Sequence, residues 1–217
     1  MSLKIIYLWA FFLCVYMLEF LFLGTSAATP TKSRNLTSLA IKRQNKQDLW
    51  LIDCGEATQH RILFSNFSLA KISCVFITHL HGDHIFGLPG LIASRSLQGV
   101  KEPLKLVGPK GIKSYIETNL RISSCYPLYP ISIIEIDAQG QEWFEDDWHV
   151  KAVPLDHGVT TFAYVFEEKK VERPFLEKRA RDFNIPMGPL WGKLQRGHDI
   201  TLDDGRKFIA NDFGGKP

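Results

Sequence analysis

A run of apolar residues that leads directly into a cluster of histidines constrains the fold of this chain more than any other feature. Residues 72–78 read Ile-Ser-Cys-Val-Phe-Ile-Thr, and their contiguous apolar side chains predict a strand buried inside a sheet. The six residues that follow are His79-Leu80-His81-Gly82-Asp83-His84. Four of these six carry an imidazole nitrogen or a carboxylate oxygen, which are zinc ligands. The sequence therefore predicts a metal site at the end of a buried strand.

The spacing within this cluster predicts how its ligands are arranged. His79 and His81 are two residues apart at the end of an extended strand, so we expect their side chains to lie on the same side. Gly82 allows a tight turn, which brings Asp83 and His84 around the corner. Such a loop can present two ligands to each of two adjacent metal ions. A surface run of histidines or a hydrogen-bonded core cluster is the alternative interpretation.

The rest of the chain predicts a mixed α/β fold. Short apolar runs or alternating runs predict further strands. They are Phe20–Leu23, Leu49–Ile52, Leu104–Val107, Ile131–Ile136 and His149–Val153. Helical spacing of apolar residues predicts helices within Glu56–Leu69, from about Pro89 onward, and over Ile112–Leu120. Asp53 follows one of these strands, where it either orients a ligating histidine or serves as a turn residue before a glycine.

Charge and cysteine content exclude some classes of protein and leave others open. The 26 Lys and Arg against 23 Asp and Glu give a net charge of +3, which permits a nucleic-acid partner without requiring one. The four cysteines are widely spaced and form no Cys-x-x-Cys pair, so neither a zinc ribbon nor a disulfide scaffold is indicated. We therefore expect reduced thiols and a cytoplasmic protein.

The N-terminal residues do not fit that picture. Ile5–Leu18 is an apolar run of 14 uncharged residues, whereas a bilayer span needs about 20. The run has the length of a signal-peptide core, and residues 25–28 offer small side chains for cleavage. Residues 1–18 are therefore either a signal or anchor or an artefact of the gene model. A membrane-anchored or exported protein, through residues 1–24, is the alternative to a cytoplasmic one, and only then would the chain contact a membrane.

Residues 167–207 differ in character from the rest, because prolines and glycines alternate with basic residues. This composition predicts a projecting arm. Its candidate phosphate contacts are five basic residues: Lys178, Arg179, Arg181, Lys193 and Arg196. Acidic neighbours such as Glu177 and Asp182 make ordinary solvated charges the alternative.

Several stretches of the sequence together resemble one known family. FITHLHGDHIFGLPGLIASRSLQG, FLGTSAATPT, WLIDCGEATQH, VGPKGI, PLDHG and IPMGPLWGKL are similar to ribonuclease Z, a tRNA 3′-processing endonuclease of the metallo-β-lactamase superfamily. The resemblance implies an αββα sandwich of the metallo-β-lactamase type over residues 19–217, with 167–207 as an arm that binds tRNA.

The resemblance also implies roles for individual residues. It assigns His79, His81 and His157 to one zinc ion, and Asp83 and His84 to a second. Asp83 is in addition the implied catalytic general base. Family members continue into a Gly-Asp-Thr-like strand end and a later histidine, which complete the second zinc site. We therefore expect a sandwich that is incomplete on its C-terminal side, with an incomplete second zinc site. The chain is then either a fragment or truncated gene, or a genuine short protein.

The function that the resemblance implies is zinc-dependent removal of 3′ trailers from precursor tRNA, which leaves a 3′-hydroxyl on the tRNA. The family acts as a homodimer, in which the arm of one subunit holds the tRNA that the other cleaves. One alternative is another hydrolase of the same fold, such as a lactonase or a thioesterase. The other is a catalytically inactive, truncated RNA-binding remnant.

Overall fold

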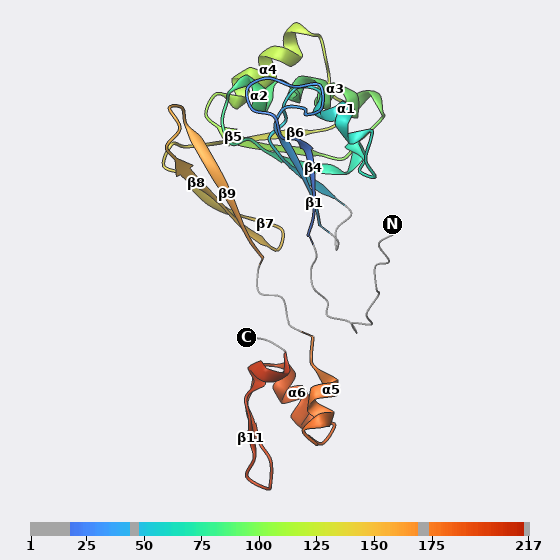
Figure 1. The fold of residues 1–217 in the computed structure, drawn as a ribbon, viewed down its shortest axis with the longest axis vertical. Helices are drawn as coiled ribbons and strands as arrows, with labels where there is room; N and C mark the ends of the chain where they lie inside the picture. Colours follow the sequence, from blue (N-terminus) through green and yellow to red (C-terminus); the bar gives the residue numbers. More distant parts are fainter. Residues whose placement is uncertain (1–17, 44–47, 169–173, 215–217) are drawn as a thin grey trace. The chain divides into compact units, whose positions relative to one another are not determined.

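The computed structural model describes residues 18–43, 48–168 and 174–214, which fall into two compact units (Figure 1). The larger unit extends to Glu167, and the smaller unit holds the described residues from Glu168 onward. Most of the apolar segment predicted at residues 1–18 lies outside the described residues, so its role as signal, anchor or artefact stays a prediction. None of the helices in the described ranges is long and apolar enough to cross a membrane.

The larger unit is built on a six-stranded sheet in which the strands follow chain order. The strands are β1 (Leu18–Gly24), β2 (Ser38–Arg43), β3 (Leu49–Ile52), β4 (Ile72–Phe76), β5 (Leu104–Pro109) and β6 (Ile131–Ile136). β1, β2 and β3 pair antiparallel, whereas β3, β4, β5 and β6 pair parallel. The parallel strands β4 and β5 are apolar on both faces, as expected for strands that are covered on both sides.

Helices cover one face of this sheet (Figure 1). They are α1 (Thr58–Ile62), α3 (Leu88–Leu97) and α4 (Ile112–Ile122), together with the 3₁₀ turn η1 (Leu69–Lys71). Their apolar side chains pack on one side of the strands, and Leu51 and Val75 belong to this core. The short helix α2 (Gly82–Ile85) follows β4 and carries part of the histidine cluster.

A second, three-stranded sheet packs on the opposite face. Its strands are β7 (Gln141–Glu145), β8 (Trp148–Leu155) and β9 (Thr161–Glu168), in that order. Trp50 and Phe76 point away from the helices and contact the aromatic rings of Trp148 and Tyr164 across the two sheets. Because successive strand residues point to opposite faces, Trp50 and Leu51 serve different cores. The larger unit therefore has three layers, in the order helix, sheet, sheet.

The predicted strands and the helices at 89 and 112 are confirmed, with boundaries that differ by a few residues. The helix predicted within Glu56–Leu69 is confirmed as α1, which is shorter than that segment and ends at Ile62. The Ser65 hydroxyl bonds the carbonyl of Ile62 and accepts from the N–H of Phe67, which replaces helical hydrogen bonds with a local turn. The strands β2, β7 and β9 were not predicted; each ends in charged residues, and β7 also has Glu142 near its start.

The smaller unit has a core of its own. It contains α5 (Glu177–Asp182), α6 (Pro189–Gln195), the strands β10 (Ile200–Thr201) and β11 (Lys207–Phe208), and the 3₁₀ turn η2 (Ala210–Phe213). Trp191, Leu194 and Phe213 are buried at its centre, and the Trp191 indole N–H donates to the carbonyl of Ile185 at 2.9 Å. A small core of this kind fixes the two short helices with respect to each other.

Candidate metal centre

The candidate site lies at the carboxyl ends of strands from both sheets. Asp53 directly follows β3, the histidine cluster begins three residues after the end of β4, and His157 follows β8. In an open α/β sheet, the carboxyl ends of the parallel strands are where ligands bind. The chain thus brings residues from three distant segments to one edge of the fold.

His79, His81 and His157 form a compact group of nitrogen ligands. One nitrogen from each ring lies within 4.8 Å of the other two. The ring centroid of His79 is 4.7 Å from that of His81 and 4.9 Å from that of His157. His79 is buried, with 5% of its surface exposed, whereas His81 and His157 are exposed. The group therefore has one fixed ligand and two at the solvent side.

This donor set fits a zinc ion. Zinc binds imidazole nitrogen at about 2.0–2.1 Å, and three histidines that leave an open position are typical of catalytic zinc sites. Tetrahedral coordination at that distance separates two nitrogens by about 3.4 Å, so the exposed His81 and His157 rings would move closer together to bind the ion. The residues present are therefore consistent with a metal site of three histidines.

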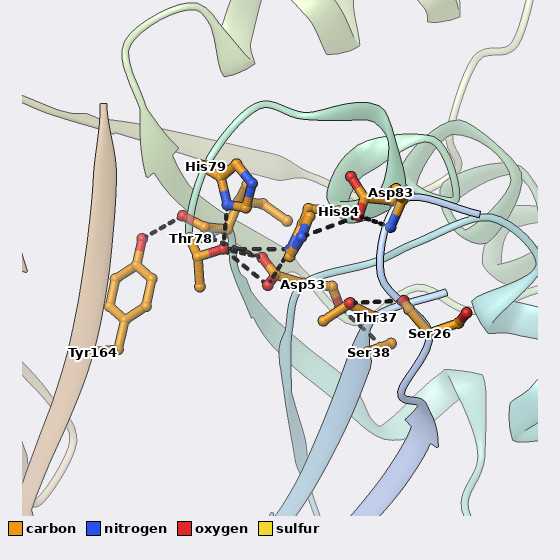
Figure 2. A network of polar contacts seen from close by, with 11 residues as sticks. Ser26, Thr37, Ser38, Asp53, Thr78, His79, Asp83, His84 and Tyr164 are labelled. Carbon is orange, nitrogen blue, oxygen red and sulfur yellow. Dashed lines mark hydrogen bonds and ion pairs between the residues drawn. The ribbon is translucent and has the colours of Figure 1, made fainter. Parts of the chain in front are cut away.

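His84 and Asp83 lie next to this group. The ring of His84 is 3.9 Å from that of His79, measured between centroids. Nδ1 of His84 is 2.7 Å from Oδ2 of the buried Asp53, and its Nε2 is 3.5 Å from Oδ2 of Asp83 (Figure 2). Asp53 thus holds one nitrogen of the ring, and the other nitrogen faces the side where Asp83 lies.

A backbone N–H from a distant loop holds Asp83. The N–H of Ala28 donates to Oδ2 of Asp83 at 2.8 Å. The loop that carries Ala28 is tied internally, because the Ser26 hydroxyl donates to the carbonyl of Thr29 at 2.6 Å and Thr37 donates to the carbonyl of Ser26 at 3.3 Å. The orientation of the Asp83 carboxylate therefore depends on the loop between β1 and β2.

Two glycines let the segments of the site approach closely. A Cβ on Gly55 would lie 2.5 Å from the carbonyl oxygen of Asp83, and one on Gly87 would lie 2.0 Å from the carbonyl oxygen of Gly55. The N–H of Gly87 also donates to the carbonyl of Cys54 at 2.9 Å. Backbone packs directly on backbone here, which fixes the ends of β3 and α2 against each other.

Burial and neighbouring charges set the protonation of the histidines. Burial, followed by the charge of His84, lowers the pKa of His79 to about 4, so this ring is neutral and available as a ligand at neutral pH. Burial also lowers the pKa of His84, but the hydrogen bond and the charge of Asp53 outweigh it and leave that pKa above its usual value.

The pKa values of Asp83 and of the nearby Cys54 thiol are shifted in opposite directions. Burial raises the pKa of Asp83, but the Ala28 N–H and the charge of His84 outweigh burial and hold that pKa below its ordinary range. Asp83 is therefore a carboxylate at neutral pH. Burial raises the pKa of Cys54, next to Asp53, to about 12, so this thiol is no nucleophile at neutral pH. The three described cysteines are all unpaired.

Comparison with known proteins shows what this chain is similar to. A family model described as "Anti-Pycsar protein Apyc1" matches residues 18–126, half of the chain. Ribonuclease Z of Bacillus subtilis is 46% identical over 197 residues, and ribonuclease BN of Proteus mirabilis is 47% identical over 197 residues. These matches cover 90% of this chain and 64% and 65% of the two relatives. The chain is a homologue of ribonuclease Z.

Solved structures show the fold of this ribonuclease Z homologue. The short form of human tRNase Z is 32% identical, with a TM-score of 0.63 over 70% of this chain and 66% of the human chain. The Bacillus subtilis metallo-β-lactamase-fold protein YhfI has a TM-score of 0.56 at 18% identity, which shows the fold alone. The α/β fold of the metallo-β-lactamase type is therefore confirmed. The homologue spans about two thirds of the length of the relatives that it matches.

The structure of this ribonuclease Z homologue brings the six site residues predicted in the larger unit together in one place. They are Asp53, His79, His81, Asp83, His84 and His157. Their individual roles stay predictions. Sequence reasoning missed Thr78, whose hydroxyl lies between Asp53 and His79, and the backbone N–H of Ala28. Thr78 stands directly before His79 in the chain, and that adjacency was the available signal.

The five basic residues predicted to bind substrate all lie in the smaller unit and are all exposed. Arg179 lies over the rings of Phe183 and Phe213 at 5.8 Å, and Arg181 lies 5.5 Å over the ring of Trp191. Arg181 also pairs with Glu177 at 3.6 Å. Within the described part of the chain, Lys178, Lys193 and Arg196 form no ion pair. These three side chains are therefore less engaged in contacts within the described part of the chain than Arg179 and Arg181.

Proposed function

We propose that this protein is a zinc-dependent endonuclease that removes 3′ trailers from precursor tRNA and leaves a 3′-hydroxyl on the tRNA. The observation that carries the proposal is the group His79, His81 and His157, which a ribonuclease Z homologue presents at the carboxyl ends of its strands. The whole relatives are longer than this chain, so the activity, the substrate and the partners are all part of the proposal.

His79, His81 and His157 would hold one zinc ion, and Asp83 and His84 would contribute to a second. Two zinc ions are the full complement of the family site, and in this proposal two described residues of the larger unit, Asp83 and His84, serve the second position. When bound, zinc supplies a Lewis acid that activates water and stabilises the negative charge on a phosphodiester. The neutral His79 supports this proposal, because a metal ligand must offer a free nitrogen lone pair.

Asp83 acts in this proposal as the general base. Its carboxylate is ionised at neutral pH, and the N–H of Ala28 holds one of its oxygens in place. The carboxylate can then accept the proton of the attacking water, a role typically worth about 10² to 10⁴ in rate. Asp53 orients His84 from the far side through the 2.7 Å contact.

The smaller unit, with residues 167–207 as the arm, holds the tRNA in this proposal. Lys178, Arg179, Arg181, Lys193 and Arg196 are exposed basic groups around a small rigid core, which suits contacts to the phosphates of a folded RNA. We further propose that the protein works as a homodimer in the cytoplasm, in which the arm of one subunit holds the tRNA that the other cleaves.

The test is cleavage of a precursor tRNA, labelled at its 5′ end, by the purified zinc-loaded chain. We expect one product that ends after the discriminator nucleotide with a 3′-hydroxyl, and no cleavage after treatment with a chelator. RNA binding without cleavage would favour the inactive RNA-binding alternative. Turnover of a lactone or thioester, with no effect on RNA, would favour the alternative of a small-molecule hydrolase.

A further inference from the structure

The hydroxyl of Thr78 lies between His79 and the Asp53 carboxylate, which in turn contacts His84. Its hydroxyl oxygen lies 3.0 Å and 2.9 Å from the two carboxylate oxygens of Asp53, and 3.0 Å from Nδ1 of His79 (Figure 2). Asp53 in turn lies 2.7 Å from Nδ1 of His84. Contacts therefore run from His79 through Thr78 and Asp53 to His84, and the Thr78 oxygen also lies 3.5 Å from Nδ1 of His84.

The positions of the protons in these contacts follow from the chemistry of a hydroxyl. A hydroxyl has one proton to donate and two lone pairs with which to accept. If Thr78 gave its proton to His79, its oxygen would face two carboxylate oxygens with no proton between them, which is repulsive. The Thr78 hydroxyl therefore donates to Asp53, and Nδ1–H of His79 donates to the Thr78 oxygen.

The proton between Asp53 and His84 can be placed in the same way. The Asp53 carboxylate can only accept, so the contact with His84 requires a proton on Nδ1 of that ring. The neutral form of each histidine then carries its proton on Nδ1 and keeps Nε2 free. In a metal-ligating histidine, the hydrogen bond made by one nitrogen decides that the other is available to the metal.

We propose that Thr78 is a positioning residue. Its hydroxyl accepts from His79 and donates to the Asp53 carboxylate, so that one buried carboxylate fixes a histidine from each of the two proposed metal positions. The inference rests on the proposed metal centre and adds to it a direct coupling between the two positions. A change at Thr78 acts mainly on the first position, because Asp53 still holds His84 at 2.7 Å, whereas a change at Asp53 alters both.

The backbone of Thr78 suits this task because it is anchored on both sides. Its N–H donates to Oδ1 of Asp53 at 2.8 Å, and its carbonyl accepts from the N–H of Phe162 in β9 at 2.9 Å. The neighbouring carbonyl of Ile77 accepts from the Tyr164 hydroxyl at 2.8 Å. With the main chain held by both sheets, a β-branched side chain has little rotational freedom left.

The first experiment needs no substitution of Thr78. Long-range ¹H–¹⁵N correlation spectra of the metal-free chain report which ring nitrogen of each histidine carries the proton, and the signals are assigned by loss in His79→Gln and His84→Gln. We expect the Nδ1–H tautomer for both histidines. An Nε2–H tautomer at His79 would overturn the proposal. Since the spectrum involves no RNA and no metal, a failure of the proposed nuclease activity leaves this readout unaffected.

The second experiment compares Thr78→Val, which removes the hydroxyl, with Thr78→Ser, which keeps it. The matched control is Ser38→Ala, because Ser38 donates to the Asp53 backbone carbonyl at 3.0 Å and not to its carboxylate. We expect His79 to lose its preference for the Nδ1–H tautomer in Thr78→Val, whereas His84 keeps that tautomer. We also expect zinc affinity, measured against a chromophoric chelator, to fall about 10- to 100-fold.

Thr78→Ser should restore both the tautomer and the affinity, and Ser38→Ala should leave both unchanged. A Thr78→Val chain that keeps the His79 tautomer and the zinc affinity would overturn the proposal. The same holds if Ser38→Ala lowers zinc affinity as much as Thr78→Val does, since the effect would then be general destabilisation. If Thr78→Val does not fold, the proposal is still tested by the His79 tautomer in the unsubstituted chain and by whether Thr78→Ser keeps that tautomer and the zinc affinity.

Discussion

Asp53 and His84 are 31 positions apart in the chain, yet Oδ2 of Asp53 lies 2.7 Å from Nδ1 of His84. The contact is possible because Asp53 adopts a left-handed backbone conformation with φ of 61°, directly after β3. Aspartate and asparagine tolerate this conformation better than other residues with a side chain. The carboxylate is thereby turned from the end of its own strand toward the histidine cluster that follows β4.

Asp53→Asn tests this contact, because asparagine keeps the size and the left-handed backbone but loses the charge. The His84 ring and the Thr78 hydroxyl would then lack their carboxylate acceptor. We expect the free energy of unfolding to fall by about 1–3 kcal/mol, as for a buried polar group left without its partner. Chemical denaturation measures it, with Asp137→Asn at an exposed position as the control. An equal change in both variants would contradict the role of Asp53.

Gly87→Ala and Gly90→Ala separate a close backbone approach from an ordinary helical glycine. At Gly87 the new Cβ would lie 2.0 Å from a backbone oxygen, whereas at Gly90 the nearest atom is the end of the flexible Gln59 side chain. We expect Gly87→Ala to cost about 1–3 kcal/mol or more from overpacking. Gly90→Ala in α3 should be neutral or stabilise by up to about 1 kcal/mol. Thermal melts of both variants provide the comparison, and a neutral Gly87→Ala would refute the packing described at the site.

Asp83→Asn distinguishes a general base from a structural residue. Asparagine can still accept the N–H of Ala28 through its amide oxygen, so we expect little change in the melting temperature. Cleavage of precursor tRNA by the zinc-loaded chain should fall at least about 100-fold, because the amide cannot take a proton from water. Affinity for the tRNA should be nearly unchanged, since phosphate contacts made elsewhere hold the substrate. Near-normal turnover would remove Asp83 from the mechanism.

The basic residues of the smaller unit make a prediction about salt. Replacing Lys178, Lys193 and Arg196 by glutamine should flatten the dependence of log affinity for tRNA on log salt concentration by roughly 2 to 3. The physical reason is that each phosphate contact releases condensed counterions. The matched control replaces three exposed basic residues of the larger unit, Lys71, Lys101 and Arg121, by glutamine. Equal slopes for the two triple variants would show that the smaller unit is not the binding element.

The sequence predicts much of the fold because the core strands are short and contiguous in apolar residues. Leu49–Ile52 and Ile131–Ile136 have the predicted bounds, since polar turn residues end each run. β2 was missed because Lys42 and Arg43 make its end look like a loop. Yet Arg43 is buried and contacts Asp48, Asp146 and the Trp50 ring, so distant partners decide that strand.

The candidate site could be predicted only in part, and for a similar reason. The cluster from His79 to His84 is local in the sequence, so its spacing alone indicates a site. His157 was assigned through the resemblance to a family, because nothing near it in the chain points to a ligand. The contributions of Thr78 and Ala28 depend on contacts between loops that are far apart, and a polar or backbone group of that kind carries no pattern in the sequence.

The zinc content of the purified chain, measured by elemental analysis after dialysis, tests the central claim most directly. We expect about one tightly held zinc ion per chain, from the three nitrogen ligands that lie within 4.8 Å of one another. We also expect His157→Asn to lose this zinc. His149→Asn should keep it, because His149 lies in β8, the strand that precedes His157, and its Nε2 is 3.0 Å from Oε2 of Glu142. A chain without zinc, or one whose zinc survives His157→Asn, would contradict the account.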